Sequence, residues 1–308
     1  MSPSLPLPLS PGNEEHELAA LVVLLRRELV PSSRVSALVE EQESAITVLS
    51  DLGSASLFPL YSGADVEDAL DKVRSWMERG LDVRPIFHRA YPESLRGIYN
   101  KPPILFVQGS WIEHRDSRSL AIVGTRKATE LGLRIATEAA AKAVSAGLTV
   151  LSGMAAGIDT AAHTSALEHS GRTVAVIGTG IDHVFPPENR GLRDRILTSG
   201  GAIFSQFFPG QPPTKWSFPM RNIVMSGLAL ATFVVEASET SGARKQARAA
   251  LEHGRPVFLL SSLVETHEWA DRMVRQGEYG VCAIQVASID EVVERLTEVP
   301  TLDHAIAV

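Results

Sequence analysis

The feature that most constrains the fold is an alternation, from residue 119 onward, of short apolar runs with segments of helical periodicity. Apolar runs bounded by glycine are typical of strands that are buried on both faces of a sheet. The predicted strands are 119–124, 148–153, 173–178, 201–206, 231–237 and 256–260. The predicted helices are 129–146, 159–169, 188–198, 221–230 and 241–253. Strands and helices that alternate in this way form right-handed βαβ units, so we expect an α/β protein with a doubly wound, mainly parallel sheet.

A different pattern precedes the sheet. Apolar residues at helical spacing predict helices over 14–29, 33–42, 44–52 and 66–77, which together form a small helical module. An irregular proline-containing stretch follows and ends in a short strand, "ILFVQG". A further helix is predicted over 289–297. We therefore expect a disordered lead-in (1–13), an N-terminal helical module (14–80), a sheet domain (81–265) and a C-terminal helical segment (266–308).

Composition limits the class of protein. The 308 residues contain no apolar run of about 18 residues, so we expect no membrane span. The proline-broken N-terminus lacks the basic region of a secretory signal. The single cysteine, Cys282, excludes an internal disulfide and is typical of a cytoplasmic protein. A net charge of −7 argues against a general polyanion binder but allows a local basic face.

The turn after the first strand of the alternation, "VGTRKAT", combines features of an anion site. Gly124 permits a tight turn, and Thr125 and Thr129 supply hydroxyls, of which Thr129 is a suitable N-cap. Arg126 and Lys127 place positive charge beside a helix N-terminus, which already favours anions. The alternative is an ordinary surface Arg–Lys pair.

The next turn, "LSGMAAGIDTAAH", suggests a ligand cradle. Gly153 and Gly157 let backbone N–H groups approach a ligand closely, and Asp159 is expected to cap the following helix. His163 lies one helical turn after Asp159, on the same face. Two residues are too few for a metal site, so we predict a hydrogen-bonded histidine and no metal.

Two later segments bring further cations to helix starts. "KWSFPMRN" carries Lys215, Arg221 and Asn222, together with two aromatic residues that we expect to seal the core, although they also suit base stacking. In "VVEASETSGARKQA" a helix starts at Ser241–Gly242, and its N-terminus favours anions. The two cations that follow, Arg244 and Lys245, either strengthen this anion site or belong to a solvated helix face. The turn "IGTGIDHVFPPEN" lacks the third glycine of a dinucleotide fingerprint, and its Asp182 and Asn189 are expected to organise the loop.

Neither a Walker phosphate loop nor an obvious catalytic nucleophile is evident, so we predict a non-catalytic phosphate binder without a cofactor. The motifs resemble those of the DNA-processing DprA/Smf family. The segments that carry the resemblance are "YPESLRGIYNKPPILFVQG", "GTRKATELG", "SGMAAGIDTAAHTSALEHSGRTVAVIGTGIDHVFPPEN", "FPMRN" and "VVEASETSGARKQARAALEHGRPVF", over roughly residues 85–260.

The resemblance implies an extended Rossmann-like domain that binds single-stranded DNA without turnover, helps to load RecA during transformation and recombination, and forms a homodimer. It also implies that Arg126 lies in the DNA pocket. The predicted DNA- or phosphate-binding residues are Gly124, Thr125, Arg126, Lys127, Thr129, Gly153, Gly157, Asp159, His163, Lys215, Arg221, Asn222, Ser241 and Gly242.

The chain also departs from the family pattern. Ala156 and Ile223 stand where arginines are usual, Gln206 where a glutamate is usual, and Gln246 about where a threonine is usual. Two alternative functions therefore remain open. One is an antitoxin or regulatory partner of a toxin protein in antiviral defence, and the other is a nucleotide-binding or nucleotide-processing protein.

Overall fold

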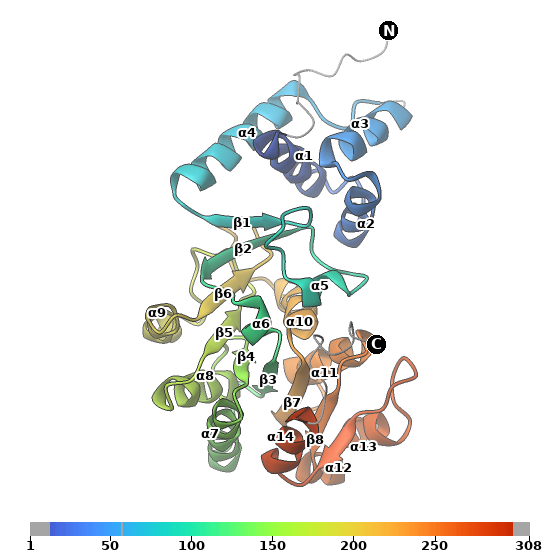
Figure 1. The fold of residues 1–308 in the computed structure, drawn as a ribbon. Coiled ribbons are helices and arrows are strands. Elements are labelled where there is room, and N and C mark those ends of the chain that lie inside the picture. Colours follow the sequence, from blue (N-terminus) through green and yellow to red (C-terminus); the bar gives the residue numbers. More distant parts are fainter. Residues whose placement is uncertain (1–12, 57, 298–308) are drawn as a thin grey trace, which may run out of the picture. The chain divides into compact units, whose positions relative to one another are not determined.

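The computed structural model describes residues 13–56 and 58–297 (Figure 1). The predicted lead-in lies outside these residues except for Asn13, which caps the first helix. Contacts divide the chain into two compact units that meet in the sequence between Val107 and Gln108. The predicted domain boundaries after residues 80 and 265 stay predictions.

The first unit begins with the four helices that were predicted, and it continues into an antiparallel strand pair, of which only the second strand, "ILFVQG", was predicted. The helices are α1 (Glu14–Arg26), α2 (Ser32–Gln42), α3 (Ala45–Ala55) and α4 (Gly63–Glu78). Buried Glu17 accepts hydrogen bonds from the backbone N–H groups of Ala45 and Ile46, so that α1 supplies the anion at the start of α3. Strand β1 (Asp82–Pro85) pairs antiparallel with β2 (Ile104–Gly109), and the one-turn helix α5 (Glu93–Arg96) lies between them in the sequence.

The second unit contains seven consecutive parallel strands and confirms the predicted α/β fold. The strands are β3 (Ser119–Gly124), β4 (Thr149–Ser152), β5 (Thr173–Val176), β6 (Ala202–Ser205), β7 (Ala231–Glu236), β8 (Val257–Leu260) and β9 (Ile284–Val286). Their order is β6-β5-β4-β3-β7-β8-β9. The chain therefore reverses its direction across the sheet at β3, which has β4 on one side and β7 on the other. Ligands of open parallel sheets bind beside such a reversal, beyond the carboxyl ends of the strands.

The helices of the second unit are α6 (Glu113–Asp116), α7 (Glu130–Ser145), α8 (Ile158–Glu168), α9 (Arg190–Thr198), α10 (Ser217–Leu228), α11 (Gly242–Glu252), α12 (Ser261–Thr266), α13 (Glu268–Arg275) and α14 (Ile289–Thr297). Helix α7 packs on α8, and α10 packs on α11 (Figure 1). None of the described helices is long and apolar enough to cross a membrane.

The start of α10 and the segment beyond residue 265 differ most from the prediction. Helix α10 begins at Ser217, four residues before the predicted start, because Pro219 lies in its first turn, where the missing N–H is not needed. Beyond residue 265 the chain contains helices as predicted, but it also returns to the sheet in β9, which pairs with β8. Three residues are too few for the sequence to show a strand pattern.

Candidate nucleic-acid interface

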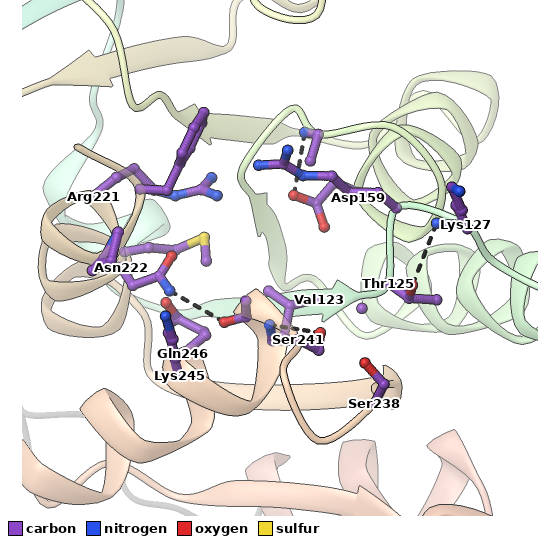
Figure 2. Close-up of a pocket in the computed structure, with 18 of the residues that line it drawn as sticks. Val123, Thr125, Lys127, Asp159, Arg221, Asn222, Ser238, Ser241, Lys245 and Gln246 are labelled. Carbon is purple, nitrogen blue, oxygen red and sulfur yellow. Dashed lines mark hydrogen bonds between the residues drawn. The ribbon is translucent and has the colours of Figure 1, made fainter. Parts of the chain in front are cut away.

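A cavity of about 340 Å³ lies beyond the carboxyl ends of β3, β4 and β7 (Figure 2). The turns after these strands and the first turns of α10 and α11 form its walls. This is the edge at which the chain reverses its direction across the sheet. Ten of the fourteen predicted site residues line the cavity: Gly124, Thr125, Arg126, Lys127, Asp159, Lys215, Arg221, Asn222, Ser241 and Gly242.

The turn after β3 is built to present two cations. A Cβ atom on Gly124 would lie 2.4 Å from Cγ1 of Ile158, so only glycine fits this close passage to α8. Thr129 caps α7, as predicted, by accepting a hydrogen bond from the N–H of Gly132 at 3.0 Å. Its hydroxyl donates to the Glu236 carboxylate at 2.9 Å, and Thr129 is not part of the cavity lining. The turn therefore leaves Arg126 and Lys127 exposed at the cavity.

The turn after β4 differs from the prediction for Asp159. The N-cap of α8 is Gly157, whose φ of 80° suits glycine, and Asp159 does not cap the helix. Its carboxylate instead accepts from the N–H groups of Gly153 at 3.1 Å and Ala155 at 3.3 Å. These amides lie at the end of β4, so the side chain turns back toward the strand. Burial raises the pKa of Asp159, and the charge of Arg221 opposes that shift.

Arg221 lies beneath the cavity and is 7% exposed. Its Nη1 donates to the carbonyl oxygen of Val176 at 2.9 Å. A Cβ atom on Gly153 would lie 1.5 Å from this nitrogen, so the glycine makes room for the guanidinium. Burial lowers the pKa of Arg221, and Asp159 opposes the shift. Gly153 itself lines a smaller adjoining cavity, which it shares with Arg126 and Arg221.

His163 does not line the cavity. It is fully buried, and its Nδ1 lies 2.7 Å from the Thr173 hydroxyl, which confirms the predicted hydrogen bond. Burial lowers its pKa to about 3. Across residues 13–56 and 58–297, no group of three or more histidine, cysteine, aspartate or glutamate side chains could hold a metal ion.

The two aromatic residues at the start of α10, Trp216 just before it and Phe218 in its first turn, contradict the expectation that they seal the core. Trp216 is 80% exposed, and Phe218 lines the cavity. The guanidinium carbon of Arg126 lies 4.7 Å from the centre of the Phe218 ring. An aromatic ring beside an exposed cation offers a face for stacking next to a charge for phosphate.

The predicted binding residues do not include two residues of α11 that line the cavity, although Lys245 is one of the two cations noted after Ser241–Gly242. Lys245 and Gln246 line the cavity within the first turns that follow the Ser241 N-cap. Ser241 accepts from the N–H of Ala243 at 3.1 Å, as expected for an N-cap. The position of both residues just after a helix start was the available signal. In the loop after β5, Asp182 accepts from the N–H of Gly210 and Asn189 donates to the carbonyl of Met154, so both organise the loop as predicted.

The charged residues that line the cavity are almost all positive. Five cations line it: Arg126, Lys127, Lys215, Arg221 and Lys245. The only carboxylate among the lining residues is Asp159, which is 4% exposed. The fold and this cavity define a Rossmann-like protein with a positively charged cavity at the carboxyl edge of its sheet.

Within that class, the chain belongs to the DNA recombination-mediator protein A family, whose sequence profile matches residues 82–297. It is 34% identical over 226 residues to the DNA processing protein DprA of Bacillus subtilis, covering 73% of this chain and 74% of that protein. It is also 34% identical over 251 residues to protein Smf of Escherichia coli, covering 80% of this chain and 64% of that one. It spans 45% of the Synechocystis protein Smf.

Solved structures agree with this assignment. The X-ray structure of DprA from Streptococcus pneumoniae has a TM-score of 0.72 and 27% identity, covering 92% of this chain and 98% of that one. DNA processing protein A from Helicobacter pylori has a TM-score of 0.61 and 22% identity, covering 71% and 96%. The second comparison is one of fold alone.

Proposed function

We propose that the protein binds single-stranded DNA in the cavity beyond the carboxyl ends of β3, β4 and β7 and performs no catalysis there. The observation that carries the proposal is the charge of the cavity, with five cations against one buried carboxylate, in a chain whose net charge is −7. Such a concentration of one sign attracts a polyanion locally despite the acidic background.

Different lining residues contact different parts of the strand, the phosphates or the bases. Arg126, Lys127, Lys215 and Lys245 are exposed and contact phosphates, while the N-terminus of α11 adds backbone N–H donors. Phe218 and exposed Trp216 offer rings on which bases stack, and stacking accepts every base. Binding of this kind depends strongly on salt, because the cations release counterions from the strand.

Family membership supports the same ligand and a place in DNA processing. DNA processing protein A from Helicobacter pylori has a unique single-stranded DNA binding mode, and this property belongs to that protein. By analogy within the family, the strand bound here is passed to RecA during DNA uptake or recombination, and the protein acts as a homodimer in the cytoplasm. These finer statements depend on the family resemblance rather than on the cavity.

The experiment that tests the proposal is titration of labelled oligo-dT at two salt concentrations against wild-type protein and Arg126→Ala. Loss of an exposed arginine that grips phosphate should weaken binding by about 1–3 kcal/mol. It should also flatten the slope of log K against log salt by about 0.7, one phosphate's share on a single strand. The melting temperature should barely change, because Arg126 is exposed.

Arg134→Ala is the matched control, since Arg134 is exposed on α7 and does not line the cavity. It removes the same charge and should leave binding nearly unchanged. Equal loss in both variants would mean that general charge, not the cavity, determines binding. If the wild-type protein binds no oligo-dT even at low salt, the DNA-binding proposal fails and a partner-protein role takes its place.

A further inference from the structure

One cavity residue has unused hydrogen-bonding capacity. Gln246 lines the cavity from α11 and is 1% exposed. Neither its side-chain oxygen nor its side-chain nitrogen has a hydrogen-bond partner among the described residues. Buried amides are almost always paired, because an unpaired one forfeits the bonds that water would make. An unpaired amide on the wall of a cavity therefore indicates a ligand that supplies the missing partners.

The polar side chains that line the cavity with Gln246 are of two chemical kinds. Arg126, Lys127, Lys215 and Lys245 are exposed cations, whereas Gln246 and Asn222 are buried amides. Figure 2 shows Asn222 and Gln246 next to each other, from α10 and α11. Asn222 already donates from Nδ2 to the carbonyl of Gly242 at 3.3 Å. Gln246 is thus the one of the two whose amide is wholly unused.

We propose that Gln246 is a nucleobase-contacting residue, whose amide rotates into the cavity and pairs with the edge of one base of the bound strand. This inference rests on the proposed single-stranded DNA binding and names a contact within the same cavity. A carboxamide presents one acceptor and two donors side by side. Thymine offers the complementary pair, an N3–H beside a carbonyl oxygen. Rotation of the amide by 180° matches the adenine or cytosine edge, so the contact adds affinity without selecting one base.

The test compares oligo-dT with an oligonucleotide of equal length in which abasic residues replace the thymidines. The two strands carry the same phosphates and differ only in their bases. The variants are Gln246→Met, which removes both polar atoms at similar volume, and the control Gln206→Met. Gln206 also has a side-chain nitrogen without a partner among the described residues, but it does not line the cavity.

We expect Gln246→Met to weaken oligo-dT binding by roughly three- to tenfold, the net worth of one or two hydrogen bonds. Binding of the abasic strand and the salt slope should not change, and Gln206→Met should behave like wild type. The melting temperature of Gln246→Met without DNA should stay the same or rise, since an unpaired buried amide is replaced by an apolar group.

Equal effects of Gln246→Met on the two strands, or no effect on either, would overturn the inference. A lowered melting temperature with unchanged discrimination between the strands would instead assign Gln246 a structural role. If the wild-type protein binds both strands equally well, the base contact is absent while the phosphate-binding proposal stands. If it binds neither, the proposed function itself fails.

Discussion

Gly157 is the residue at which the geometry of the cavity is most easily tested. Its φ of 80° and ψ of −124° are open to glycine but strained for any other residue. A Cβ atom here would lie 2.5 Å from the carbonyl oxygen of Thr125 and 2.7 Å from that of Arg126. Both contacts are with backbone, so no side chain can swing away to relieve them. Gly157→Ala must therefore strain its own turn and displace the turn that carries Arg126.

The expected cost has two parts. A non-glycine residue at such a φ costs about 1–3 kcal/mol, and forcing an extra methyl into a packed site costs about 1–3 kcal/mol more. We therefore expect the free energy of unfolding to fall by at least about 2 kcal/mol. For a unit of this size that corresponds to a melting temperature lower by roughly 4 °C or more. Affinity for oligo-dT should fall toward that of Arg126→Ala, because Arg126 is displaced.

Thermal or urea unfolding and an oligo-dT titration measure the two effects on the same protein. Gly191→Ala is the matched control, because Gly191 lies in α9 without a positive φ and an added Cβ there meets nothing within 4 Å. That variant should be neutral or more stable by up to about 1 kcal/mol. If Gly157→Ala unfolds and binds like wild type, the turn after β3 is not fixed by its contact with Gly157, and the described geometry of the cavity is wrong.

Two further predictions concern acid stability and assembly. The pKa of His163 is about 3 in the folded protein, below its ordinary 6.5, so the unfolded chain takes up the proton first. The stability that this group contributes above pH 6.5 should be lost as the pH falls toward 3, by at most about 1.4 kcal/mol per unit. His163→Gln should flatten the pH slope measured by urea unfolding, and an unchanged slope would contradict the burial argument. Light scattering at micromolar concentrations should give the mass of a homodimer, and a monomer mass would refute that expectation.

The turns between strands and helices were largely predictable from the sequence. Thr129 and Ser241 cap helices at the predicted starts, and a glycine is required at Gly124, where a Cβ atom would clash with Ile158. Because the carboxyl ends of parallel strands meet at one edge, the cations in separate strand-to-helix turns come together there. Arg126 and Lys215 are far apart in the chain, and both line the cavity.

What the sequence could not predict depends on the direction of single side chains. Asp159 is a good capping residue by type, yet it turns back to Gly153 and Ala155 because buried Arg221 and the free amides lie on that side. Phe218 is an apolar aromatic residue of the kind that usually lies in a core, and only the packing of α10 decides that its ring faces the cavity. Such choices follow from tertiary contacts, which residue type and periodicity do not record.

The departures from the family pattern bear on where the binding free energy comes from. Ala156 is exposed and lines the smaller adjoining cavity beside Arg126, at a position where the resemblance leads us to expect an arginine. Ile223, on α10, likewise replaces an expected cation. Each phosphate contact that is lost removes about 0.7 from the salt slope on a single strand. In the proposed complex, a chain with fewer cations and a net charge of −7 would therefore obtain more of its affinity from the bases. The aromatic ring of Phe218 and the unpaired amide of Gln246 are the lining groups with the chemistry to supply it.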